Sequence, residues 1–154
     1  MKLRIHSVAG KMPAWVQAGV DEYVKRLPRE LAPEWVDLPL AKRARNVKTL
    51  DVVAQETDRL LRSVREDHVV LLDISGKNWS TEELAESMTS WQREGRDVSL
   101  VVGGPDGVDD RLRQRAQQRW SLSRLTLPHP LVRVLLAEQL YRGWTVQQGH
   151  PYHK

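Results

Sequence analysis

Two short apolar runs constrain the fold of this chain more than any other feature. Residues 68–73 (HVVLLD) and 97–102 (DVSLVV) are almost continuously apolar, which is typical of β-strands covered on both faces. Turn-forming residues follow each run, Ile74-Ser75-Gly76-Lys77 after the first and Gly103-Gly104-Pro105-Asp106-Gly107 after the second. A strand buried on both faces needs helices above and below it, so the two runs predict an α/β sandwich.

The rest of the chain alternates between strand and helix patterns. Apolar residues at helical spacing over residues 50–64 predict the clearest amphipathic helix. Ser80 with Glu83 forms a capping box that opens another helix, and Gly95 is its expected end. We expect one domain over residues 1–154, with a mostly parallel sheet sandwiched by helices. The expected strands are residues 3–7, 35–38, 68–73, 97–102 and 125–127, and the expected helices begin near residues 13, 50, 80, 109 and 131.

Some apolar residues carry further expectations about packing. Trp15, Trp91, Trp120 and Trp144 fall at helical spacing, and we assign them to packing in the core or at its rim. Trp120 would belong to the helix that Asp109 or Asp110 caps. Val132, Leu136 and Leu140 make the last helix apolar on more than one face. Such a surplus favours burial against a second copy of the chain, although an internal helix covered on all sides would also explain it.

Composition narrows the class of protein. The chain has no cysteine, which excludes disulfides and thiolate metal sites. Its start alternates polar and apolar residues, unlike a secretory signal, and no apolar run is long enough to cross a bilayer. We therefore expect a cytoplasmic protein. The net charge of +4 favours a polyanionic partner, but a solvated basic surface is an equally simple explanation.

The expected strand ends would meet at one edge of the sheet. Open parallel sheets bind ligands beyond the carboxyl ends of their strands, which here are residues 73–77, 103–107 and 127–130. Gly103 and Gly104 allow a ligand to approach the backbone closely, although a bare turn is the more common role of such a pair. The glycines fit neither a dinucleotide fingerprint nor a phosphate-binding P-loop. The sequence therefore predicts a small-molecule crevice bordered by free backbone groups.

A few polar side chains could act in such a crevice. His129, between two prolines, is either a rigidly presented ligand or a turn residue. Glu138 and Arg142 have the spacing of an ion pair within a helix, which is either structural or holds the arginine toward the crevice. The tail adds His150, Tyr152 and His153. We expect no metal site, because no helical histidine pair with a carboxylate is present.

Taken together, these segments resemble a known family. The resemblance rests on residues 72–77, 103–107, 121–129 and 150–154, with residues 10–16 and 22–26 near the start, and it runs from end to end. In combination the segments are similar to those of the ribosomal RNA large subunit methyltransferase H family, within the SPOUT methyltransferases. The resemblance implies a carboxyl-terminal deep trefoil knot, S-adenosyl-L-methionine bound at a homodimer interface, and methylation of N3 of a pseudouridine in large-subunit ribosomal RNA on assembled ribosomes.

The resemblance also implies roles for individual residues. His129, Arg142, Tyr152 and His153 would lie on the substrate side, with His153 or His129 as general base and Arg142 supplying positive charge. Two other classes remain open: a ribosome- or RNA-binding protein without catalytic activity, and an enzyme acting on a small phosphorylated metabolite. That the target is pseudouridine rather than uridine follows from the resemblance alone. The implied cofactor contacts are Leu72, Gly103, Gly104, Leu122, Ser123, Arg124, Leu125, Thr126 and Leu127.

Overall fold

A parallel five-stranded sheet forms the centre of the molecule. The structure is a computed structural model that describes all residues from 1 to 154. The strand order is β2-β1-β4-β3-β5, and every neighbouring pair is parallel, as the sequence predicts. The strands are β1 (Leu3–Val8), β2 (Glu34–Leu38), β3 (His68–Asn78), β4 (Val98–Val102) and β5 (Gln118–Ser121).

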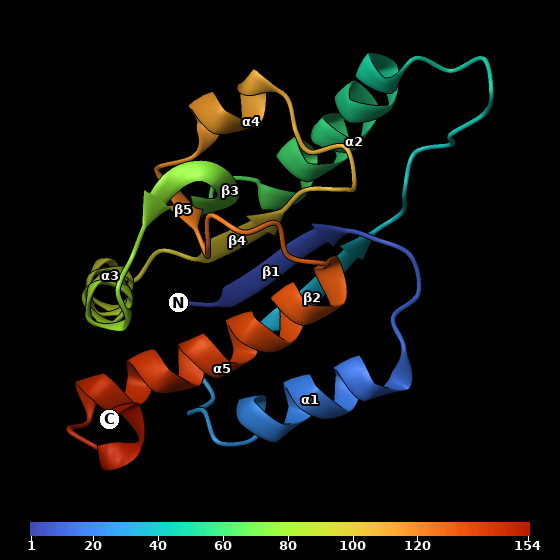
Figure 1. The fold of residues 1–154 in the computed structure, drawn as a ribbon. Coiled ribbons are helices and arrows are strands. Elements are labelled where there is room, and N and C mark those ends of the chain that lie inside the picture. The colour runs from blue at the N-terminus through green and yellow to red at the C-terminus, as the bar shows by residue number, and fades with distance from the viewer.

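Helices cover both faces of this sheet (Figure 1). Helices α1, α3 and α5 pack on one face, and α2 and α4 pack on the other. None of the helices combines the length and the apolar character that crossing a membrane requires. The helices are α1 (Ala14–Val24), α2 (Thr49–Val64), α3 (Thr81–Glu94), α4 (Asp110–Arg115) and α5 (His129–Gln147), with a terminal 3-10 helix η1 (Pro151–His153).

Side-chain alternation along β1 divides the core between the two faces. Leu3 and Ile5 pack with α3 and α5 in the larger apolar cluster, whereas Val8 joins Leu60 and Val64 of α2 in the smaller one. This division follows from the period of two along a strand. The polar residues His6 and Ser7 of this strand are also buried.

Local capping interactions set the helix limits that the sequence indicates. The Ser80 hydroxyl accepts a hydrogen bond from the Glu83 amide at 3.1 Å and caps α3. Gly95 ends that helix with φ of +72°, a conformation that glycine adopts without strain. Asp109 caps α4 by accepting from the Arg111 amide at 3.0 Å. Pro13 is the N-cap residue of α1, which begins at Ala14, close to the start expected near residue 13.

The expected turn at residues 74–77 is wrong, because β3 continues through it to Asn78. The register against β5 shifts between Leu72 and Lys77, so this stretch is a bulge within the strand. A Cβ on Gly76 would lie 2.7 Å from the backbone carbonyl of Arg119. Glycine is therefore needed for close strand approach rather than for a turn.

Two expectations about residues 116–127 are also wrong. Helix α4 ends at Arg115, and Trp120 belongs to β5, where its ring stacks on Trp79 at a centroid distance of 4.9 Å. Pairing with β3 offers this segment more burial than a continued polar helix would. Residues 125–127, expected as a strand, form no strand.

Burial departs from expectation at four apolar positions. Trp15 is 53% exposed and is not a core residue, unlike Trp91 and Trp120. Val132, Leu136 and Leu140 are buried within the chain, so they leave no surplus apolar surface for a second copy. Leu131 and Leu135 of the same helix are the exposed ones, at 45% and 37%.

A buried hydrogen-bond chain ties β1 to β4. Ser99 donates its hydroxyl proton to Asp67 at 2.6 Å, so it accepts from His6 Nε2 at 2.8 Å. Nδ1 of His6 is then left to accept from the Ser63 hydroxyl. Burial lowers the pKa of His6 to about 4. The negative charge of Asp67 opposes this shift, and the positive charge of Arg4 adds to it.

This lowered pKa predicts a pH dependence of stability. The unfolded chain binds a proton at His6 near pH 6.5, whereas the folded chain does so only near pH 4. The contribution to stability is therefore complete above pH 6.5 and is lost as the pH falls toward 4. We expect urea unfolding at pH 7.5, 5.5 and 4.5 to show a smaller decline for His6→Gln than for the natural chain. Equal declines in the two proteins would contradict this prediction.

Candidate functional site

A cavity of about 660 Å³ opens at the carboxyl ends of the strands. Segments that follow β1, β2, β4 and β5 form its walls together with the bulged part of β3. This is the edge at which open parallel sheets bind ligands. A volume of this size suits a small organic ligand.

The structure brings most of the implied cofactor contacts together in this cavity. Arg124 lies on the loop that follows β5, between contacts that do line the cavity, but it does not line the cavity itself and is exposed. His129, from the expected substrate group, also lines it. The implied contacts that do line it are Leu72, Gly103, Gly104, Leu122, Ser123, Leu125, Thr126 and Leu127.

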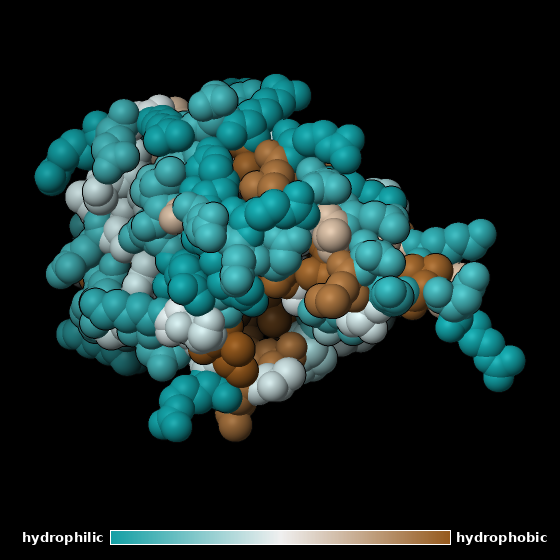
Figure 2. Space-filling view, turned by 90° about the horizontal axis from the view of Figure 1, so that it is seen from above, coloured by the Kyte–Doolittle hydropathy of each residue, from teal (hydrophilic) through white to brown (hydrophobic).

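The cavity has an apolar rim without a partner in the chain. Leu40, Ile74 and Leu125 all line it, and they are 39%, 58% and 73% exposed. The face seen in Figure 2 is largely hydrophilic, but hydrophobic side chains gather around a hollow in it. Large apolar side chains left in solvent around a hollow indicate a surface that a ligand covers. Flat apolar groups, such as a purine ring, fit between side chains of this kind.

Glycines keep one wall of the cavity free of side chains. A Cβ on Gly103 would lie 2.8 Å from Val108, and one on Gly104 would lie 2.6 Å from Oε1 of Glu56. The Glu56 carboxylate is fully buried and cannot move aside easily, because Arg43 donates two hydrogen bonds to it, at 2.9 and 3.0 Å. The amide of Ala41 donates a third at 2.9 Å. This ion pair fixes the segment after β2 against helix α2, and a second pair of Arg43 with Asp106 at 3.2 Å joins the same segment to the loop after β4.

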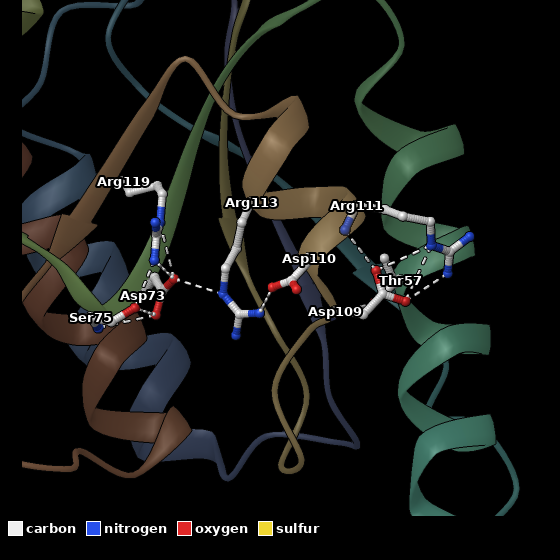
Figure 3. Close-up of polar contacts among 8 residues, drawn as sticks. All are labelled: Thr57, Asp73, Ser75, Asp109, Asp110, Arg111, Arg113 and Arg119. Carbon is white, nitrogen blue, oxygen red and sulfur yellow. Dashed lines mark hydrogen bonds and ion pairs between the residues drawn. The ribbon is translucent and has the colours of Figure 1, made fainter.

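Asp73 is the centre of a charged network beside the cavity (Figure 3). Its Oδ2 accepts from Arg119 at 2.8 Å and from Arg113 at 3.1 Å. Burial alone would raise the pKa of Asp73, but hydrogen bonds from Ser75 and these arginines hold it below its usual value. Arg113 also pairs with Asp110 at 2.8 Å. The network ties the bulge of β3 to helix α4 and β5, and keeps an ionised carboxylate at the cavity.

His129 is held at the cavity as a neutral imidazole. Nε of Arg133 donates to His129 Nε2 at 2.9 Å, so the lone pair of that nitrogen is engaged. Burial, then the charge of Arg133, lowers the pKa of His129 to about 4 against the opposing effect of Asp37. Arg133 is itself buried and also donates to Ser7 at 2.9 Å and to Asp37.

The remaining substrate-side candidates form a separate cluster at the far end of α5. Nη2 of Arg142 lies 2.6 Å from Oε1 of Glu138, which confirms the ion pair that the spacing predicts. The Tyr152 hydroxyl lies 3.3 Å from the same carboxylate oxygen. The guanidinium of Arg142 lies over the aromatic ring of Tyr152. His153 contacts the carbonyl of His150. Arg142, Tyr152 and His153 do not line the cavity of their own chain.

The sequence contained signals for residues that we did not select. Glu56 falls within the apolar stripe of its helix, beside Val53 and Leu60, and a carboxylate in that place requires a buried partner. Arg133 is likewise a charge among the apolar residues of the last helix. Their partners Arg43 and Asp37 lie in distant segments, so spacing alone gives no indication of them.

The residues that line the cavity suit an organic cofactor. No group of three or more His, Asp or Glu side chains is placed to hold a metal ion. The cavity combines an apolar rim, a glycine wall and the ionised Asp73. These features fit a purine nucleoside with a charged substituent, and they define an α/β protein that binds such a ligand beyond its sheet.

Comparison with known families identifies the class. A family described as "Predicted SPOUT methyltransferase" matches residues 1–153. The chain belongs to this family, and its cofactor is S-adenosyl-L-methionine. The resemblance inferred from the sequence motifs is therefore confirmed.

Individual relatives agree with this assignment. The chain is 52% identical to the ribosomal RNA large subunit methyltransferase H of Hahella chejuensis, over 100% of this chain and 99% of that protein. It is 53% identical to the protein of the same name from Chromohalobacter salexigens, over 100% of both chains. Among solved structures, a probable methylase family protein from Haemophilus influenzae has a TM-score of 0.57 at 10% identity, covering 99% of this chain and 70% of that one, and it supports the fold alone.

Proposed function

We propose that this chain methylates N3 of a pseudouridine in large-subunit ribosomal RNA, and that it acts on assembled ribosomes as a homodimer. The observation that carries the proposal is the cavity, in which eight of the nine implied cofactor contacts gather around a side-chain-free wall. The names of the relatives supply the substrate class, since each is called a ribosomal RNA large subunit methyltransferase.

In the proposed mechanism the cavity positions the cofactor through shape and backbone groups. Bound S-adenosyl-L-methionine would supply an electrophilic methyl group on a sulfonium centre. Gly103 and Gly104 would let the ligand reach the main chain, while Leu72, Leu122 and Leu127, which line the cavity, would cover its apolar ring. Holding both reactants in line removes much of the entropic cost of the transfer.

The target nitrogen needs a proton acceptor and a nearby positive charge. N3 of a pseudouridine carries a proton and becomes nucleophilic only when that proton leaves. His129 is poorly suited to remove it, because its pKa is about 4 and its Nε2 lone pair is engaged by Arg133. We therefore assign the base to His153. Arg142, held by Glu138, would stabilise the developing negative charge on the ring.

Homodimerisation would unite the two groups of residues. Within one chain, Arg142, Tyr152 and His153 lie outside the cavity, so a second copy must bring them to it if they act there. Exposed Leu131 and Leu135 on α5 provide apolar surface for such a contact. The carboxyl-terminal trefoil knot implied by the family resemblance belongs to the same proposal, since the loops that would form it also line the cavity.

Mass spectrometry of ribosomal RNA gives the direct test. We expect RNA from cells lacking this protein to lose one methylated pseudouridine. Purified protein with S-adenosyl-L-methionine should restore that methylation on ribosomes and much less on free RNA. A protein that binds ribosomes but transfers no methyl group would support the non-catalytic alternative. Methylation of a uridine instead would show that the proposed target base, pseudouridine, is wrong.

A further inference from the structure

A second hollow, of about 540 Å³, lies between helix α2 and the edge strand β2. Val36 and Leu38 of β2 form part of its floor, and residues from the second half of α2 form a wall. Helices α1 and α5 lie on the other face of the sheet (Figure 1), so this face of β2 is not covered by them. We call the hollow the basic groove; it is lined by Arg4, His6, Val36, Leu38, Arg59, Arg62, Ser63 and Arg65.

The groove contains four arginines and no carboxylate among its lining residues. Arg4 is neutralised by Asp67 at 2.9 Å and by Asp97 at 3.2 Å. Arg59, Arg62 and Arg65 form no ion pair, in contrast to the arginines beside the cofactor cavity. Arg59 donates to the Pro39 carbonyl at 2.7 Å and Arg62 to the Asp58 carbonyl at 3.4 Å, so most donors of these guanidiniums remain free.

A purely local explanation accounts for only part of this arrangement. Cations near the carboxyl end of a helix offset its dipole, and Arg62 lies in the last turn of α2 with Arg65 just beyond it. Arg59 lies more than one turn before the end of the helix. The helix dipole also does not explain why arginines from β1 and from the α2 region, four in all, line the same concave surface.

The basic groove and the cofactor cavity share one segment of chain. Leu38 lines the groove, while its register partner Val8 and the nearby Leu40 line the cavity. The Pro39 carbonyl between them accepts the hydrogen bond from Arg59. The groove therefore begins beside the cavity at Arg59 and continues along α2 to Arg62 and Arg65, so a strand of nucleic acid that enters the cavity and follows this helix would bring its phosphates to the groove.

We propose that the basic groove binds backbone phosphates of the RNA substrate through Arg59, Arg62 and Arg65. The inference rests on the proposed function for the identity of the substrate, but the binding itself does not require methyl transfer. Guanidinium groups match phosphate oxygens with paired hydrogen bonds. Because phosphates are the same in every sequence, the contact orients the RNA without selecting the target base.

The test compares two double variants with the same change in charge. Arg62→Gln with Arg65→Gln alters the groove, whereas Arg29→Gln with Arg93→Gln removes two exposed arginines elsewhere, Arg93 being in the last turn of its helix as Arg62 is. Fluorescence anisotropy with a labelled hairpin RNA at graded salt measures the affinity. Two lost phosphate contacts should reduce the salt slope by about 1.5 and weaken binding by roughly tenfold, while the control changes far less.

Further measurements separate the sources of the phosphate. With ribosomes as substrate, the groove variant should raise KM and leave kcat and S-adenosyl-L-methionine affinity close to those of the control. Equal RNA affinity and salt slope in the two variants would overturn the inference. So would calorimetric binding of inorganic phosphate that the groove variant abolishes while RNA affinity is unchanged. Arginine-dependent RNA binding by a chain that transfers no methyl group would support the groove and reject the proposed function.

Discussion

Gly104→Ala should lower the affinity for S-adenosyl-L-methionine by at least about tenfold, equivalent to ~1.4 kcal/mol. The added Cβ would lie 2.6 Å from Oε1 of Glu56, a buried oxygen that accepts a hydrogen bond from Nη2 of Arg43 at 3.0 Å. Because that carboxylate is fixed, the loop after β4 has to move toward the cavity. Overpacking of this kind also costs roughly 1–3 kcal/mol of stability. Isothermal calorimetry and urea unfolding measure the two effects.

The control for this prediction is a second buried glycine away from the cavity. A Cβ on Gly143 would lie 2.6 Å from the sulfur of Met88, which is buried in the main apolar cluster. Gly143→Ala should therefore lower stability but keep the affinity for S-adenosyl-L-methionine. If both variants lose cofactor affinity in proportion to their loss of stability, the lower affinity comes from destabilisation of the whole fold and not from a change in the cavity wall. If Gly104→Ala binds normally, the proposed wall of the site is wrong.

The sequence predicted the parts of the fold that depend on local patterns. Continuous apolar runs located β3 and β4, and helical periodicity located α2 and α5. The capping pattern at Ser80 placed the start of α3 correctly. The crevice followed from the parallel sheet, because the carboxyl ends of its strands share one edge.

The parts that failed depend on contacts between distant segments. Trp120 fits a helical spacing equally well, and only pairing with β3 and stacking on Trp79 place it in β5. Gly76 looks like a turn residue until the backbone of Arg119 is seen beside it. The ion pair of Glu56 with Arg43 joins residues whose approach no local pattern specifies.

Removal of residues 150–154 should reduce methyl transfer by a factor of about 10³ or more, the scale expected when a general base and its supporting charge are both lost. The ring of Tyr152 packs against the ring of Tyr141 at a centroid distance of 4.6 Å, and the guanidinium of Arg142 lies over it. Loss of Tyr152 therefore also frees Arg142. The tail lines no part of the cavity in its own chain. Affinity for S-adenosyl-L-methionine should therefore remain within about twofold of the full chain, a difference below ~0.5 kcal/mol.

Mixing two impaired chains, with S-adenosyl-L-methionine held well below the weakened Kd of the Gly104→Ala cavity so that neither chain is active alone, shows which cavity each tail serves. One chain ends at Gly149, and the other carries Gly104→Ala with its tail intact. If the tail acts across a two-fold interface, a mixed dimer has one intact cavity facing one intact tail. With random pairing, half of the dimers are mixed, and about a quarter of the wild-type sites are restored. If each tail serves its own cavity, no combination has a working site, and activity stays at the level of the separate variants. Recovery of activity on ribosomes after joint refolding thus decides between a shared site and two independent ones.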